Sequence, residues 1–188
     1  GALLDAWLEV VAEDAYHRDL LDLLKSPFVF AEVDAAERHG AVLHIEQTIV
    51  SENLITGLHL YETALARNGA QPTQPIPSIA LELIRRIRRA RQACPKTPAT
   101  LKVWLSRLEE ALSLLGALPP LRADAAGASV LELIAARREE LAEADLTLGF
   151  PEWRDWLNRE LETQMFRDRS ISSPVLMTHL TAARLRTF

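Results

Sequence analysis

Apolar residues recur at spacings of three and four along most of this chain, which is the periodicity of amphipathic helices. The clearest segment is 100–115, where Leu101, Trp104, Leu105, Leu108, Leu112 and Leu115 fall on one helical face. Similar patterns occupy positions 3–11, 20–24, 42–50, 54–65, 79–90, 130–141 and 151–169. The pattern predicts an all-α protein, an irregular multi-helix bundle of about eight helices with at most one short C-terminal strand.

Several of these segments are preceded or followed by residues that favour helix ends. Side chains that accept hydrogen bonds from free N–H groups predict N-caps at Asp14, Asp34, Asn53 and Ser129. Gly116 is expected to close the helix over 100–115, and Pro151 to sit in the first turn of the last one. The apolar loop 28–30 is expected to enter the core.

Proline positions suggest how the chain is divided. Residues 70–77 contain three prolines and predict a linker. We expect residues 1–170 to form one helical domain, which this linker would divide into two lobes if it separates two cores. The only strand-like run is 175–178, and a short helical pattern follows over 179–186. Because a lone strand cannot pair its backbone groups, we expect 171–188 to begin a sheet that continues in a longer protein.

Charge and cysteine content narrow the class of protein. The formal net charge is −5, so the whole surface does not suit nonspecific nucleic-acid binding, although a local basic patch would. A single cysteine, Cys94, excludes an internal disulfide, and no apolar run approaches the length of a membrane span. These features, with no visible signal peptide, favour a cytoplasmic protein.

The residues that usually carry catalysis or bind cofactors do not form a recognisable site. The chain has neither a P-loop nor a GxGxxG motif, so we expect no ATP or dinucleotide site in it. His39 and His44 are five residues apart, which does not place them on one helix face for a metal. Carboxylates near Arg137, Arg138 and Arg159 predict a solvated, salt-bridged face. We therefore expect no catalytic or metal-binding residues.

One charged run is distinctive: Arg85, Arg86, Arg88, Arg89 and Arg91. On a helix, Arg85, Arg88 and Arg89 share one side, opposite Ile84 and Ile87. Guanidinium groups can bind phosphate oxygens in pairs of hydrogen bonds, so the five are candidates for contacting a DNA backbone. The alternative is a purely structural role, for example pairing with the acidic helix over 132–143.

Two segments resemble UvrD-like superfamily I helicases. The C-terminal SPVLMTHLTAARLRTF is similar to the strand and Thr-x-His turn that open their second RecA-like motor domain, with the turn at Thr178 and His179. Ala183-Arg184-Leu185-Arg186 stands where a Lys-Gly-Leu-Glu-like stretch is usual, which resembles the degenerate motors of AddB-type repair exonucleases. The segment 23–40, LLKSPFVFAEVDAAERHG, resembles a stretch early in their helical insertion.

The resemblance implies a non-catalytic accessory domain of a DNA-repair helicase or exonuclease. Residues 1–170 would be its helical (2B-like) insertion, which positions duplex DNA or a partner subunit, and Thr178, His179 and Arg184 would belong to a degenerate motor motif. ATP and Mg²⁺ would then be candidate cofactors of the parent protein, not of this piece. An alternative is a protein–protein scaffold without DNA contact, docking through exposed tryptophans or the loop 28–33.

Overall fold

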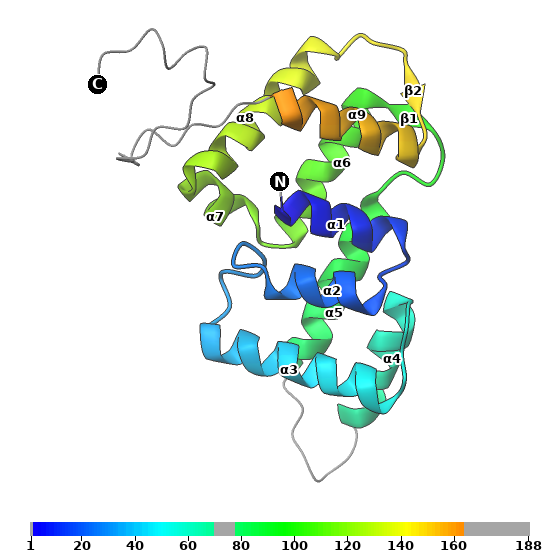
Figure 1. The fold of residues 1–188 in the computed structure, drawn as a ribbon, viewed down its shortest axis with the longest axis vertical. Coiled ribbons are helices and arrows are strands. Elements are labelled where there is room, and N and C mark those ends of the chain that lie inside the picture. Colours follow the sequence, from blue (N-terminus) through cyan, green and yellow to red (C-terminus); the bar gives the residue numbers. More distant parts are fainter. Residues whose placement is uncertain (1, 70–77, 164–188) are drawn as a thin grey trace, which may run out of the picture.

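The computed structural model describes residues 2–69 and 78–163, and within these ranges it is almost entirely helical (Figure 1). Its helices are α1 (Ala2–Ala12), α2 (His17–Lys25), α3 (Ala35–Ser51), α4 (Leu58–Gly69), α5 (Ser78–Ala93), α6 (Leu101–Leu114), α7 (Leu118–Ala123), α8 (Ala125–Glu140) and α9 (Phe150–Thr163). Two short strands, β1 (Ala99–Thr100) and β2 (Thr147–Leu148), pair antiparallel. The all-α multi-helix bundle is confirmed.

Helix α5 is the central element of the bundle. It packs against α3 and α4 toward one end of the molecule and against α6 toward the other (Figure 1). Its residues at helical spacing, Ala80, Leu83, Ile84, Ile87 and Ala90, are completely buried. They join one continuous core with α1–α4 and with α6 and α9, so the helices on both sides of 70–77 share a single hydrophobic interior.

The helix ends show which side chains act as caps. Asp34 accepts hydrogen bonds from the backbone N–H groups of Ala36 and Glu37, at 2.9 and 3.1 Å, as predicted. Ser129 is not a cap, because α8 begins earlier and is capped by Asp124. The backbone of Gly116 has φ +66°, which confirms its position just past α6.

Asp14 and Asn53 are not caps either. Both have left-handed backbone conformations, with φ of 50° and 49°, which a residue entering a helix does not adopt. Helix α2 begins at His17 after Tyr16, and α4 begins only at Leu58. Short polar side chains tolerate the left-handed region, and the two residues form tight turns instead.

The tryptophans are largely internal, contrary to the expectation that exposed ones would dock a partner. Trp7, Trp104 and Trp153 are buried, and Trp156 is half-buried. Trp104 stacks on Trp153 with ring centroids 4.7 Å apart, and its indole N–H donates to the carbonyl of Leu148 at 2.9 Å. This bond fixes β2 against α6, which accounts for the unpredicted strand pair.

The loop 28–33 is divided between the core and the surface. Val29 and Phe30 are fully buried, so the expected insertion of 28–30 into the core is confirmed, whereas Ala31 and Glu32 are exposed.

No helix of the described ranges is long and apolar enough to cross a membrane. The predicted strand at 175–178 and the helical pattern at 179–186 lie outside the residues that the structure describes.

Candidate nucleic-acid interface

Helix α5 presents its arginines around the side that the core does not use. Arg85 and Arg89 lie opposite the buried face, Arg86 lies beside it, and Arg91 lies in line with it at the end of the helix, one turn after Ile87. The structure therefore does not gather the five arginines into one row. Three of them form an outer group. The other two lie apart from this group and from each other, and each has its own contacts.

The outer group consists of Arg85, Arg88 and Arg89. Arg85 Nε donates to one carboxylate oxygen of Glu62 at 2.9 Å, and Arg88 Nη1 donates to the other. Arg89 pairs with Glu82 on its own helix, at 2.5 Å. The three arginine side chains remain 49%, 42% and 54% exposed. Their guanidinium groups are thus held on one side of the helix and still face solvent.

Glu62 is the carboxylate that organises this group. Burial alone would raise the pKa of Glu62, but hydrogen bonds and charge from Arg85 and Arg88 outweigh it and lower the pKa below its ordinary value. Glu62 therefore stays ionised and holds two guanidinium groups with one negative charge. With Glu82, two carboxylates face three guanidiniums, which leaves the outer group with one net positive charge.

Arg86 has a different environment. Its Nε donates to the backbone carbonyl of Leu114 at 2.9 Å, and Nη1 donates to Glu32 at 2.5 Å. The guanidinium lies over the ring of Phe30, with its carbon 4.7 Å from the ring centroid. Only 22% of the side chain is exposed. Arg86 ties α5 to the end of α6 and to the loop that precedes α3, so its role is structural.

Arg91 pairs with Asp14 from the turn between α1 and α2, at 2.7 Å. Asp14 and Ala15 both have left-handed backbones, with φ of 50° and 56°, which costs about 1–2 kcal/mol per non-glycine residue. The turn is held by the N–H of Gly57, which donates to the Asp14 carbonyl at 2.8 Å, and by the buried Tyr61 hydroxyl. The fold thus holds Asp14 firmly beside Arg91.

The acidic partners of these arginines were not identified from the sequence. They are Glu62, Glu32, Glu82 and Asp14, and not the carboxylates of 132–143. In that later region Arg137 pairs with Glu140 and Glu160, which confirms the predicted salt-bridged face. Only Glu82 could have been expected from the sequence, since it lies on α5 itself, two turns before Arg89. The others are brought in by tertiary packing.

Other candidate chemistry is limited in the described ranges. No group of three or more His, Cys, Asp or Glu side chains there could hold a metal ion. Burial raises the pKa of Cys94 to about 11, although the positive charge of Arg91 lowers it in part. The thiol is therefore protonated near neutral pH, and a protonated thiol is a poor nucleophile. Thr178, His179 and Arg184 lie outside the described residues.

Comparison with known proteins adds no relative: neither a protein-family model, nor a curated protein, nor a solved structure matches this chain.

Proposed function

We propose that this chain is a non-catalytic helical accessory domain of a DNA-repair helicase or exonuclease, and that it positions duplex DNA. The family assignment rests on the resemblance of its segments 23–40 and 173–188. The role is supported by one observation: Arg85, Arg88 and Arg89 are half-exposed on one side of α5 and, within the described residues, share two carboxylates. ATP hydrolysis and nuclease chemistry would belong to the parent protein.

The intramolecular pairs do not prevent these arginines from binding phosphate. The Arg89–Glu82 pair is exposed on both sides, and such a pair is worth about 0–1 kcal/mol, because water and salt screen it. In the pairs with Glu62 the carboxylate is more buried, but the guanidinium groups of Arg85 and Arg88 still reach solvent. A phosphate contact, in contrast, releases counterions from DNA and gains from bidentate hydrogen bonding. The pairs with Glu62 and Glu82 then keep the guanidiniums extended and in place until phosphates replace part of the carboxylate contacts.

The structure-based division of the arginines makes the proposal specific. Arg85, Arg88 and Arg89 are the residues proposed to contact the backbone. Arg86 would act only through folding, since its guanidinium is occupied by Phe30, Glu32 and the Leu114 carbonyl. Arg91 faces the turn at Asp14 and not the outer group.

The test is reversal of the three charges in the otherwise intact protein, with Arg85, Arg88 and Arg89 each replaced by glutamate. Duplex binding is measured over a range of salt concentrations. Each phosphate contact contributes about 0.9 to the slope of log K against log salt, so the loss of three contacts should reduce the slope by nearly three. The control is Arg107→Glu on α6, which removes an exposed arginine paired with Glu110 and should leave the slope unchanged.

An unchanged affinity and slope in the triple variant would reject DNA contact by α5. The alternative, docking of a partner subunit, would then be favoured. One observation supports that alternative: Leu43 and Val50, two turns apart on α3, are 44% and 76% exposed. Polar replacement of both would weaken association with a partner subunit and leave DNA binding as it was.

A further inference from the structure

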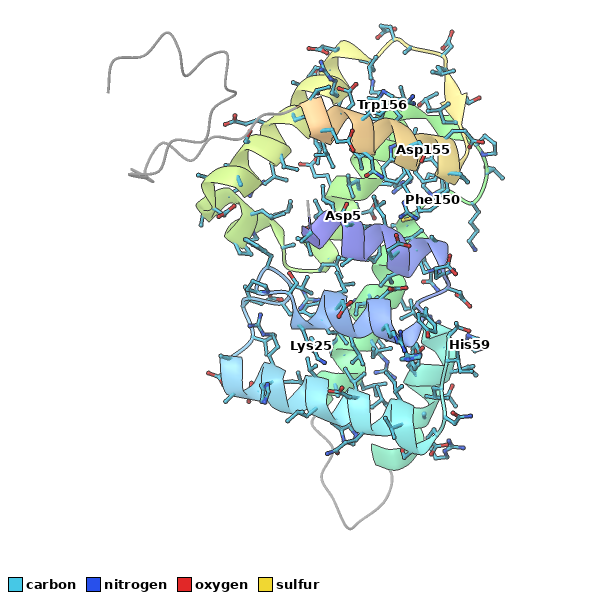
Figure 2. The ribbon with its side chains drawn as sticks, viewed as in Figure 1. Asp5, Lys25, His59, Phe150, Asp155 and Trp156 are labelled. Carbon is cyan, nitrogen blue, oxygen red and sulfur yellow. The ribbon has the colours of Figure 1, made fainter. Side chains whose placement is uncertain are left out.

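A cavity of about 550 Å³ opens where α1 and α5 end and where α4 and α9 begin. Its size is within the range of small-ligand sites. His59 and Phe150 lie in its wall, on the same edge of the molecule (Figure 2). Two helices begin in this wall and two end there, so the positive partial charges of the N-termini and the negative partial charges of the C-termini offset each other. The electrostatic potential in the cavity therefore depends on its charged side chains.

Those side chains are predominantly basic. Arg88, Arg91 and Lys96 line the cavity, and Asp14 is the single carboxylate among its lining residues. Among the lining residues, three cations face one carboxylate, and Glu62, which is shared with Arg85 and is not among the lining residues, offsets part of the charge of Arg88. His59 adds a ring N–H donor. A phosphate monoester carries about −1.5 to −2 charges near neutral pH, so it gains more from this positive surplus than a singly charged carboxylate or phosphodiester does.

The cations are held in defined positions. Arg91 is held by Asp14 at 2.7 Å, and Arg88 by Glu62. Asp14 sits in the left-handed turn described above, and strained backbone of this kind gathers at binding sites in proteins. Lys96 is exposed at the rim, between Pro95 and the short strand β1. Two guanidiniums held by carboxylates and one exposed ammonium are suited to enclosing a terminal phosphate.

The remaining wall is apolar and includes one aromatic ring. Val11, Leu58 and Pro95 line it with Phe150. The Phe150 ring is supported from behind by Trp104 and Trp153, with centroids at 6.1 and 5.9 Å. An aromatic side chain fixed in this way can stack on a nucleobase while the phosphate meets the cations.

We infer that this cavity binds the terminal phosphate monoester of a nucleotide, either free or at the 5′ end of a DNA strand. The inference extends the proposed function by adding recognition of a strand end to contact with internal phosphates. It shares Arg88 with the outer arginine group but depends also on Lys96, His59 and Phe150, which are not part of that group. Its failure can therefore be distinguished from failure of the proposed function.

The experiment compares two blunt duplexes of the same sequence, one with 5′-phosphate and one with 5′-hydroxyl ends. The wild-type chain should bind the phosphorylated duplex more tightly by on the order of tenfold, the change that one charge-assisted hydrogen bond gives. Lys96→Glu should abolish this preference. Lys25→Glu, the same charge change on α2 toward the opposite edge of the molecule (Figure 2), should preserve it.

A competition arm separates the two sources of the phosphate. Displacement of the phosphorylated duplex by a nucleoside 5′-monophosphate, but not by the nucleoside, assigns the cavity to any 5′-nucleotide. Displacement only by a second phosphorylated duplex assigns it to strand ends. Equal binding of the two duplexes by the wild-type chain, or loss of the preference in Lys25→Glu as well, overturns the inference. If the affinity for both duplexes still depends on Arg85, Arg88 and Arg89, the proposed function stands without it.

Discussion

Replacing Tyr61 with phenylalanine removes one oxygen atom from the turn that positions Asp14. The Tyr61 side chain is 1% exposed, and its hydroxyl lies 3.0 Å from the Ala15 carbonyl and 2.9 Å from that of Ile55. Burial raises the pKa of Tyr61, and the charge of Asp14 raises it further, so the hydroxyl is a permanent donor. The Ile55 carbonyl keeps a second donor in this variant, the N–H of His17 at 2.9 Å.

The expected loss of stability follows from these contacts. The hydrogen bond itself contributes about 1 kcal/mol, and the buried Ala15 carbonyl left without this donor costs about 1–3 kcal/mol more. The aromatic ring remains, so no cavity term is added. We expect Tyr61→Phe to lower the free energy of unfolding by about 2–4 kcal/mol, which for a chain of this size lowers Tm by roughly 4–16 °C.

Urea unfolding followed by circular dichroism measures this difference, with the slope m expected to be unchanged. The matched control is Tyr16→Phe, since Tyr16 is the chain's other tyrosine and is only half-buried. A half-buried side chain leaves its hydroxyl open to water, so the loss should stay below about 0.5 kcal/mol. An equal effect of the two substitutions would refute the reasoning that the Tyr61 hydroxyl holds the strained turn.

Three further predictions concern single positions. Gly116→Ala should destabilise the protein by about 1–2 kcal/mol in urea unfolding, because φ is +66° there and a Cβ would overlap the Glu32 carboxylate; no loss would contradict this backbone conformation. Glu62 has a lowered pKa in the folded state, so its contribution to stability is present above its ordinary pKa of about 4.5 and is lost as pH falls through the folded value. The stability difference between wild type and Glu62→Gln should accordingly shrink on acidification from pH 6 to pH 3, and a difference that grows would be the opposite of this linkage. Cys94 should react slowly with a thiol reagent at pH 8 and rapidly after unfolding in urea, since its pKa is raised to about 11 by burial; equal rates would show that the thiol is accessible.

The helices could be predicted from the sequence because each is encoded locally. The apolar spacing in 100–115 and the side chain of Asp34 act within a few residues, and both predictions are confirmed. The errors at Asp14 and Asn53 have a common cause. The same short polar side chains that cap helices also tolerate a left-handed turn, and local sequence does not distinguish the two uses.

The arrangement of the arginines could be predicted only in part. Helical periodicity correctly placed Arg85, Arg88 and Arg89 on one side of α5. It could not identify Glu62 and Asp14 as their partners, because α4 and the α1–α2 turn meet α5 only through tertiary packing. The cavity beside Phe150 was not expected for the same reason, since its wall combines residues from four separate parts of the chain.

We propose that the outer arginines of α5 are available to DNA phosphates although carboxylates hold them. Glu62→Gln tests this availability, because glutamine keeps the shape of Glu62 and one of its two acceptor oxygens and removes the competing charge. The measurement is duplex affinity across a salt series for wild type and Glu62→Gln, with folding checked by circular dichroism. We predict tighter binding by the variant at low salt and a slope of log K against log salt steeper by up to about 0.9, one additional phosphate contact. Equal or weaker binding by a folded Glu62→Gln variant would contradict the claim.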